Sequence, residues 1–129
     1  MVLKIYTDGG SRGNPGKAAC SFIIVENDKI IKKYSEFLGV KTNNEAEYNA
    51  IIRALENAKD NEIEIFSDSE LVIRQLNKEY KIKKEHLREL NEKINILTKN
   101  RKIKFSNVKR ENKFITGADF LVNIELDKH

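Results

Sequence analysis

Four acidic residues stand at positions from which their side chains could act together on a metal ion. Asp8 follows an apolar run and opens a glycine-rich segment, and Asp68 also follows a short apolar run. Glu47 lies near the start of a helical pattern, and Asp119 lies near the carboxyl end of the sequence. Carboxylates that converge at one edge of a sheet repel each other unless hard cations neutralise them. The pattern therefore predicts a site for Mg²⁺ or Mn²⁺ that performs phosphoryl chemistry.

The same residues also have ordinary structural explanations. Asn44 can be the N-cap of a helix with Glu47 at its third position, which is a capping-box arrangement. The segment 8–16 can be a turn in which glycines take positive φ values and Pro15 fixes its own φ. This segment is not a P-loop, because Lys17 is followed by alanine rather than by serine or threonine.

The periodicity of the apolar residues predicts the elements that would position these side chains. The element order β-β-β-α-β-α-α-β-α predicts an α/β fold with a five-stranded mixed sheet. Three antiparallel strands come first, two parallel strands follow, and helices cover both faces. A single domain over residues 1–129 is expected. The expected strands cover residues 2–7, 18–25, 30–38, 62–66 and 103–108, and the expected helices cover residues 44–58, 71–76, 84–99 and 118–126.

The composition is that of a water-soluble globular protein with a mildly basic surface. The chain has 129 residues, of which 40% are hydrophobic and 34% charged, and this balance excludes an intrinsically disordered chain. No apolar stretch approaches the roughly 20 residues that cross a bilayer, so no membrane partner is expected. The amino terminus shows no signal peptide, which favours a cytoplasmic location. The net charge of +4 comes from clustered basic residues, and this suits a polyanion held over an acidic metal site.

Four motifs together resemble those of the type 1 ribonuclease H family, in the short form without an N-terminal hybrid-binding domain. They are residues 6–16 (YTDGGSRGNPG), 42–48 (TNNEAEY), 66–72 (FSDSELV) and 118–123 (ADFLVN). The resemblance implies a ribonuclease H-like fold and two Mg²⁺ or Mn²⁺ ions per site. It implies that the catalytic residues and metal ligands are Asp8, Glu47, Asp68 and Asp119. It implies contacts with nucleic acid for Gly9, Gly10, Ser11, Asn14, Thr42, Asn43, Asn44 and Glu70.

The resemblance further implies an endonuclease that hydrolyses the RNA strand of RNA–DNA hybrids and leaves 5′-phosphate and 3′-hydroxyl ends. The hybrid is the expected partner, and the protein is expected to act as a monomer without a protein partner. Many family members carry a histidine in the loop before the last carboxylate, whereas the loop 108–117 has none. Glu111 in this loop is the candidate for the proton-shuttle role. The alternative hypothesis is a non-catalytic nucleic-acid-binding domain that has kept the fold.

Overall fold

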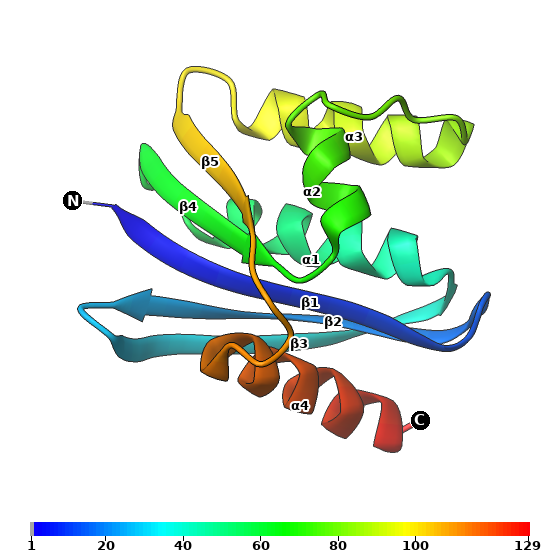
Figure 1. The fold of residues 1–129 in the computed structure, drawn as a ribbon. Helices are drawn as coiled ribbons and strands as arrows, with labels where there is room; N and C mark the ends of the chain where they lie inside the picture. Colours follow the sequence, from blue (N-terminus) through cyan, green and yellow to red (C-terminus); the bar gives the residue numbers. More distant parts are fainter. Residues whose placement is uncertain (1) are drawn as a thin grey trace.

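The computed structural model describes residues 2–129, which form one five-stranded sheet and four helices (Figure 1). The sheet order is β3-β2-β1-β4-β5; β1, β2 and β3 are antiparallel, and β4 and β5 are parallel to β1. The expected fold class is therefore confirmed. The strands are β1 (Leu3–Gly13), β2 (Gly16–Glu26), β3 (Lys29–Lys41), β4 (Glu62–Ser67) and β5 (Lys102–Asn107). The helices are α1 (Asn43–Asn57), α2 (Glu70–Leu76), α3 (Glu85–Leu97) and α4 (Lys113–Asp127).

The helices cover the two faces of the sheet unequally. Figure 1 shows α1, α2 and α3 on one side of the sheet and α4 on the other. Because side chains alternate along a strand, Ile5 and Phe22 face the larger core under α1, whereas Tyr6 and Ile23 face α4. Ile115 of α4 is fully buried against this second face. None of the helices over residues 2–129 has the length and apolar character needed to span a bilayer.

The glycine-rich segment is strand rather than the turn that its composition predicts. β1 continues through Asp8 to Gly13, and only Asn14 and Pro15 separate it from β2. Pairing with β2, from Asp8 opposite Ser21 onward, holds these glycines in the ladder despite their low strand propensity. The prediction that β1 ends before Asp8 is therefore wrong. Asp8 instead lies just beyond the stretch over which β1 pairs with β4, beside the carboxyl end of that parallel strand.

The capping box of α1 is present, but it uses different residues from those predicted. Thr42 is the N-cap, and its Oγ1 accepts a hydrogen bond of 3.2 Å from the backbone N–H of Glu45. The Glu45 carboxylate accepts in return from the backbone N–H of Thr42 at 2.9 Å. The capping roles predicted for Asn44 and Glu47 are therefore wrong. Glu47 lies two residues further along the helix, where its side chain faces the sheet instead of the helix end.

Helix α4 begins five residues before the predicted helix at Ala118. Its N-cap is Asn112, whose side chain accepts hydrogen bonds from the backbone N–H groups of Phe114 and Ile115. The prediction missed this start because Gly117 reads as a helix breaker. In the structure Gly117 meets the sheet closely, since an added Cβ would lie 3.1 Å from Cδ1 of Ile23. Asp119 consequently lies in the second turn of α4.

Candidate active site

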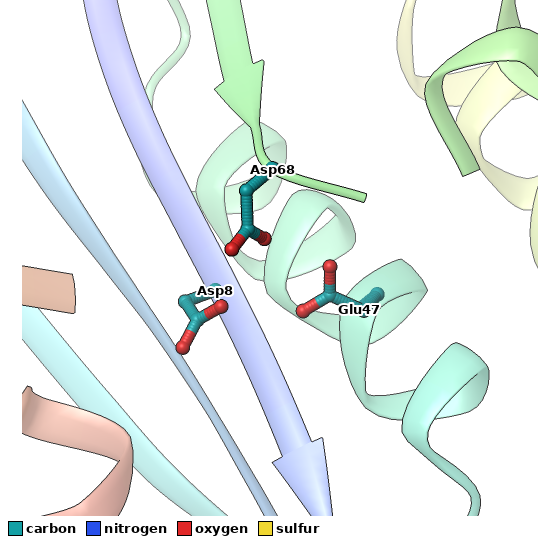
Figure 2. A group of neighbouring side chains, drawn as sticks. All are labelled: Asp8, Glu47 and Asp68. Atoms are coloured by element: carbon teal, nitrogen blue, oxygen red, sulfur yellow. The ribbon is translucent and has the colours of Figure 1, made fainter. Parts of the chain in front are cut away.

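Three carboxylates from separate elements meet at the centre of the sheet. Asp8 comes from β1, Glu47 from α1, and Asp68 from the segment that follows β4 (Figure 2). Their ligand oxygens all lie within 4.8 Å of one another. Asp8 and Glu47 are buried, and the Asp68 side chain is 14% exposed. Three hard oxygen ligands at this spacing match the donors that Mg²⁺ and Mn²⁺ prefer.

Glu47 is held in place by hydrogen bonds to both carboxylate oxygens. The backbone N–H of Gly9 donates to Oε1, and the hydroxyl of Ser67 donates to Oε2 at 3.4 Å. Ser67 is itself fixed, because its hydroxyl accepts from the backbone N–H of Ser69 at 3.0 Å and its carbonyl accepts from Asn107 at 3.0 Å. The interior of β1 and the carboxyl ends of β4 and β5 thus all contribute to the orientation of one carboxylate.

The cluster carries negative charge that its surroundings only partly compensate. Burial raises the pKa of the Asp8 carboxyl above its ordinary value, and the charges of Glu47 and Asp68 raise it further. Burial likewise raises the pKa of Glu47, and the charge of Asp68 adds to this effect. The hydrogen bonds from Gly9 and Ser67 and the positive charge of Arg110 lower the pKa of Glu47, but by less than burial raises it. A bound cation would relieve the remaining repulsion.

Asp119 lies at the edge of this cluster rather than within it. It is exposed on α4, and it is not among the carboxylates that meet within 4.8 Å. Its charge and a hydrogen-bonding contact nevertheless raise the pKa of the Asp8 carboxyl. The structure therefore brings three of the four predicted carboxylates together and places the fourth beside Asp8.

An open cleft of about 930 Å³ contains all four carboxylates and most of the residues predicted to contact nucleic acid. The predicted residues that line it are Gly9, Gly10, Ser11, Asn43, Asn44, Glu70 and Glu111. Thr42 and Asn14 do not line the cleft. Thr42 caps α1, and the side-chain oxygen of Asn14 accepts a hydrogen bond of 3.0 Å from the backbone N–H of Asn43. Their contacts with nucleic acid stay predictions.

The cleft also has lining residues that the motifs did not single out as site residues. Lys109 and Arg110 follow β5, and the Arg110 guanidinium lies 3.5 Å from the Asp68 carboxylate. Arg12 of β1 and Asn123 of α4 also line the cleft. One available signal was the position of Lys109 and Arg110 after a strand parallel to β4, because carboxyl ends of parallel strands share an edge.

The family model for RNase H matches residues 2–119, which include all four acidic residues. The chain therefore belongs to the RNase H family, as its motifs predicted. The structure of RNase H1 from Halobacterium salinarum has a TM-score of 0.93 to this fold at 34% identity, with 100% of both chains covered. The structure of LC11-RNase H1 in complex with an RNA/DNA hybrid has a TM-score of 0.90 at 40% identity, with 98% of this chain and 97% of that chain covered.

Curated relatives agree in family but are longer than this chain. Ribonuclease HI of Halobacterium salinarum is 48% identical over an alignment of 75 positions, which covers 55% of this chain and 38% of that protein. The bifunctional protein Rv2228c of Mycobacterium tuberculosis is 32% identical over an alignment of 133 positions, which covers 98% of this chain and 36% of that protein. This chain thus spans less than two fifths of the length of these relatives.

Proposed function

We propose that this chain is a metal-dependent endonuclease that hydrolyses the RNA strand of RNA–DNA hybrids and leaves 5′-phosphate and 3′-hydroxyl ends. The observation that carries the proposal is the meeting of Asp8, Glu47 and Asp68 within 4.8 Å at the floor of an open cleft. Membership of the RNase H family and the likeness to LC11-RNase H1, a structure with an RNA/DNA hybrid, support the choice of substrate.

The donor set fits a hard divalent cation. Asp8, Glu47 and Asp68 offer only carboxylate oxygens, and Asp119 offers a further carboxylate at the edge of the cluster. We assign these four residues as the ligands for Mg²⁺ or Mn²⁺, with two ions per site. Such ions, when bound, activate water for attack on phosphorus and stabilise the leaving oxygen.

Neighbouring groups of this chain fix the orientation of the carboxylates in the site. The N–H of Gly9 and the hydroxyl of Ser67 fix the direction of the Glu47 carboxylate, so a ligand meets preorganised oxygens. Arg110 lies beside Asp68 with its side chain 84% exposed, which leaves its guanidinium accessible to a phosphate of the substrate. Glu111 lines the cleft in the same loop and is the proposed proton shuttle.

Recognition of the hybrid is assigned to the rim of the cleft. Gly9, Gly10 and Ser11 present backbone along β1, and Asn43 and Asn44 begin α1 next to them. These groups are suited to bind ribose 2′-hydroxyls, which distinguish RNA from DNA at a given position. Contacts of this kind read shape and backbone, so cleavage is expected to be largely independent of sequence.

The test is cleavage of end-labelled duplexes that differ only in one strand. An RNA–DNA hybrid should be cut in its RNA strand, and a DNA duplex of the same sequence should remain intact. The ends should accept ligation and polymerase extension as 5′-phosphate and 3′-hydroxyl ends do. Tight binding of the hybrid without cleavage at any Mg²⁺ or Mn²⁺ concentration would instead support the non-catalytic nucleic-acid-binding domain.

Two further expectations belong to the same proposal. The protein is proposed to act as a monomer without a protein partner, which light scattering in the presence and absence of the hybrid would test. A cytoplasmic location is also proposed, and cell fractionation would test it.

A further inference from the structure

A chain of polar contacts runs along α4 to the carboxylate at the edge of the acidic cluster. Asn123 lies one helical turn after Asp119, so the two side chains share a face of the helix, and both line the cleft. The side-chain amide of Asn123 donates to the Asp119 carbonyl at 3.1 Å and to its carboxylate oxygen Oδ2 at 3.4 Å. The carboxylate of Asp119 thus has a donor on its own helix.

Asn123 is in turn held by a side chain of β1. The Arg12 guanidinium of β1 donates to the carbonyl and to Oδ1 of Asn123, both at 3.4 Å. Arg12 also forms an ion pair of 2.6 Å with Asp127, one helical turn after Asn123. Because Arg12 uses the oxygen of the Asn123 amide, the amide nitrogen is directed toward Asp119.

We propose that Asn123, held by Arg12, is a positioning residue that fixes the direction of the Asp119 carboxylate at the edge of the cluster. The inference rests on the proposed function, because it treats Asp119 as a metal ligand. An exposed aspartate samples several rotamers, so a ligand at an exposed position of α4 needs a partner that selects one of them. The other carboxylates do not need this help in the same way, because Asp8 and Glu47 are buried.

The decisive experiment is a double-mutant cycle of Asn123→Ala and Asp119→Asn. Binding of Mn²⁺ is measured by calorimetry without nucleic acid, and kcat and KM are measured for hybrid cleavage. Asn123→Ala should weaken Mn²⁺ binding and lower kcat by about 10-fold with little change in KM for the hybrid, as outer-shell losses do. In the Asp119→Asn background, Asn123→Ala should cause no further loss.

Matched variants separate positioning from helix stability. Asn57 makes the same kind of side-chain bond on α1, to the carbonyl of Arg53 at 2.8 Å, but it does not line the cleft. Asn57→Ala should therefore change thermal stability as much as Asn123→Ala does, with Mn²⁺ binding unchanged. Arg12→Ala should weaken Mn²⁺ binding in the wild-type background and have no effect when Asn123 is already alanine.

Three outcomes would overturn the inference. Additive losses in the double variant would mean that Asn123 does not act through Asp119. Wild-type Mn²⁺ binding by Asn123→Ala would mean that it positions nothing. Unchanged Mn²⁺ binding by Asp119→Asn would remove the ligand that Asn123 is said to orient. In that last case the proposed nuclease function still stands if the wild-type protein cuts the hybrid and Asp8→Asn does not.

Discussion

The backbone N–H of Gly9 donates a hydrogen bond directly to the Glu47 carboxylate, which joins the central strand to the first helix at the acidic cluster. The contact requires glycine, because a Cβ on residue 9 would lie 2.3 Å from the carbonyl carbon of Ala46 and 2.5 Å from the backbone nitrogen of Glu47. The absence of a side chain at Gly9 therefore allows both the close approach of β1 to α1 and the hydrogen bond that orients Glu47.

Gly9→Ala should lower the free energy of unfolding by about 1–3 kcal/mol, because backbone atoms of α1 must move away from the new methyl group. Gly10→Ala is the matched control, since the nearest atom to its Cβ would be Cγ1 of Val122 at an ordinary 3.7 Å. Chemical denaturation of both variants checks this prediction. Equal stability of the two variants would mean that β1 and α1 do not depend on a glycine at position 9.

Glu47→Gln should abolish most of the activity while the protein stays folded, because an amide cannot supply the charge that binds the cation. Glu45→Ala should do the reverse, since it removes half of the capping box and should cost about 1 kcal/mol of stability with turnover retained. Activity assays and thermal unfolding of the pair separate the two roles. If Glu45→Ala lost activity and Glu47→Gln kept it, Glu47 would have a structural role and not a catalytic one.

Asp8→Asn should stabilise the metal-free protein, and the gain should grow with pH. The raised pKa of Asp8 means that the folded state holds a proton that the unfolded state has released. The stability of the wild-type protein should therefore fall relative to the variant as pH rises from about 4, the ordinary range of an aspartate, through neutral pH. Denaturant unfolding in EDTA across this range measures the difference. Added Mg²⁺ should reduce this difference in stability. A difference that is constant with pH would argue against repulsion among Asp8, Glu47 and Asp68.

Asp119→Asn should lower activity and shift the metal optimum upward, because one ligand loses its charge. Glu111→Gln should lower the rate without changing the metal optimum if Glu111 acts only as the proton shuttle. A Mn²⁺ titration of hybrid cleavage by both variants distinguishes these roles. An upward shift of the metal optimum in the Glu111 variant alone would make Glu111 the metal ligand in place of Asp119.

The order of elements was readable from the sequence because it depends on local pattern. The motifs also pointed to Asp8, Glu47 and Asp68, which the structure brings together. Alternating apolar residues predicted the strands, and the alanine repeat at 46, 50, 54 and 58 predicted the helix that carries Glu47. A mixed sheet with three antiparallel strands followed by two parallel strands was predicted from the same reading and is confirmed.

The features that the sequence pattern did not predict depend mainly on contacts between segments that are distant in the sequence. Gly9 and Gly10 read as turn residues, and only pairing with β2 keeps them in a strand. Thr42 and Asn44 are both good N-caps by residue type, so residue type alone does not choose between them. The backbone that leaves β3 places Thr42 at the N-cap position. Asn123 has no catalytic signature of its own. Helical spacing places it beside Asp119, and only the packing of α4 on the sheet brings Arg12 to it.

The central claim is that the carboxylate cluster hydrolyses the RNA strand, and it is tested most directly by comparing the wild-type protein with Asp8→Asn on one labelled RNA–DNA hybrid. With Mg²⁺ or Mn²⁺ present, the wild-type protein should cut the RNA strand, and EDTA should stop it. Asp8→Asn should bind the hybrid at least as well, because the cleft loses negative charge, yet leave the RNA strand intact. Cleavage by Asp8→Asn at the wild-type rate would contradict the account.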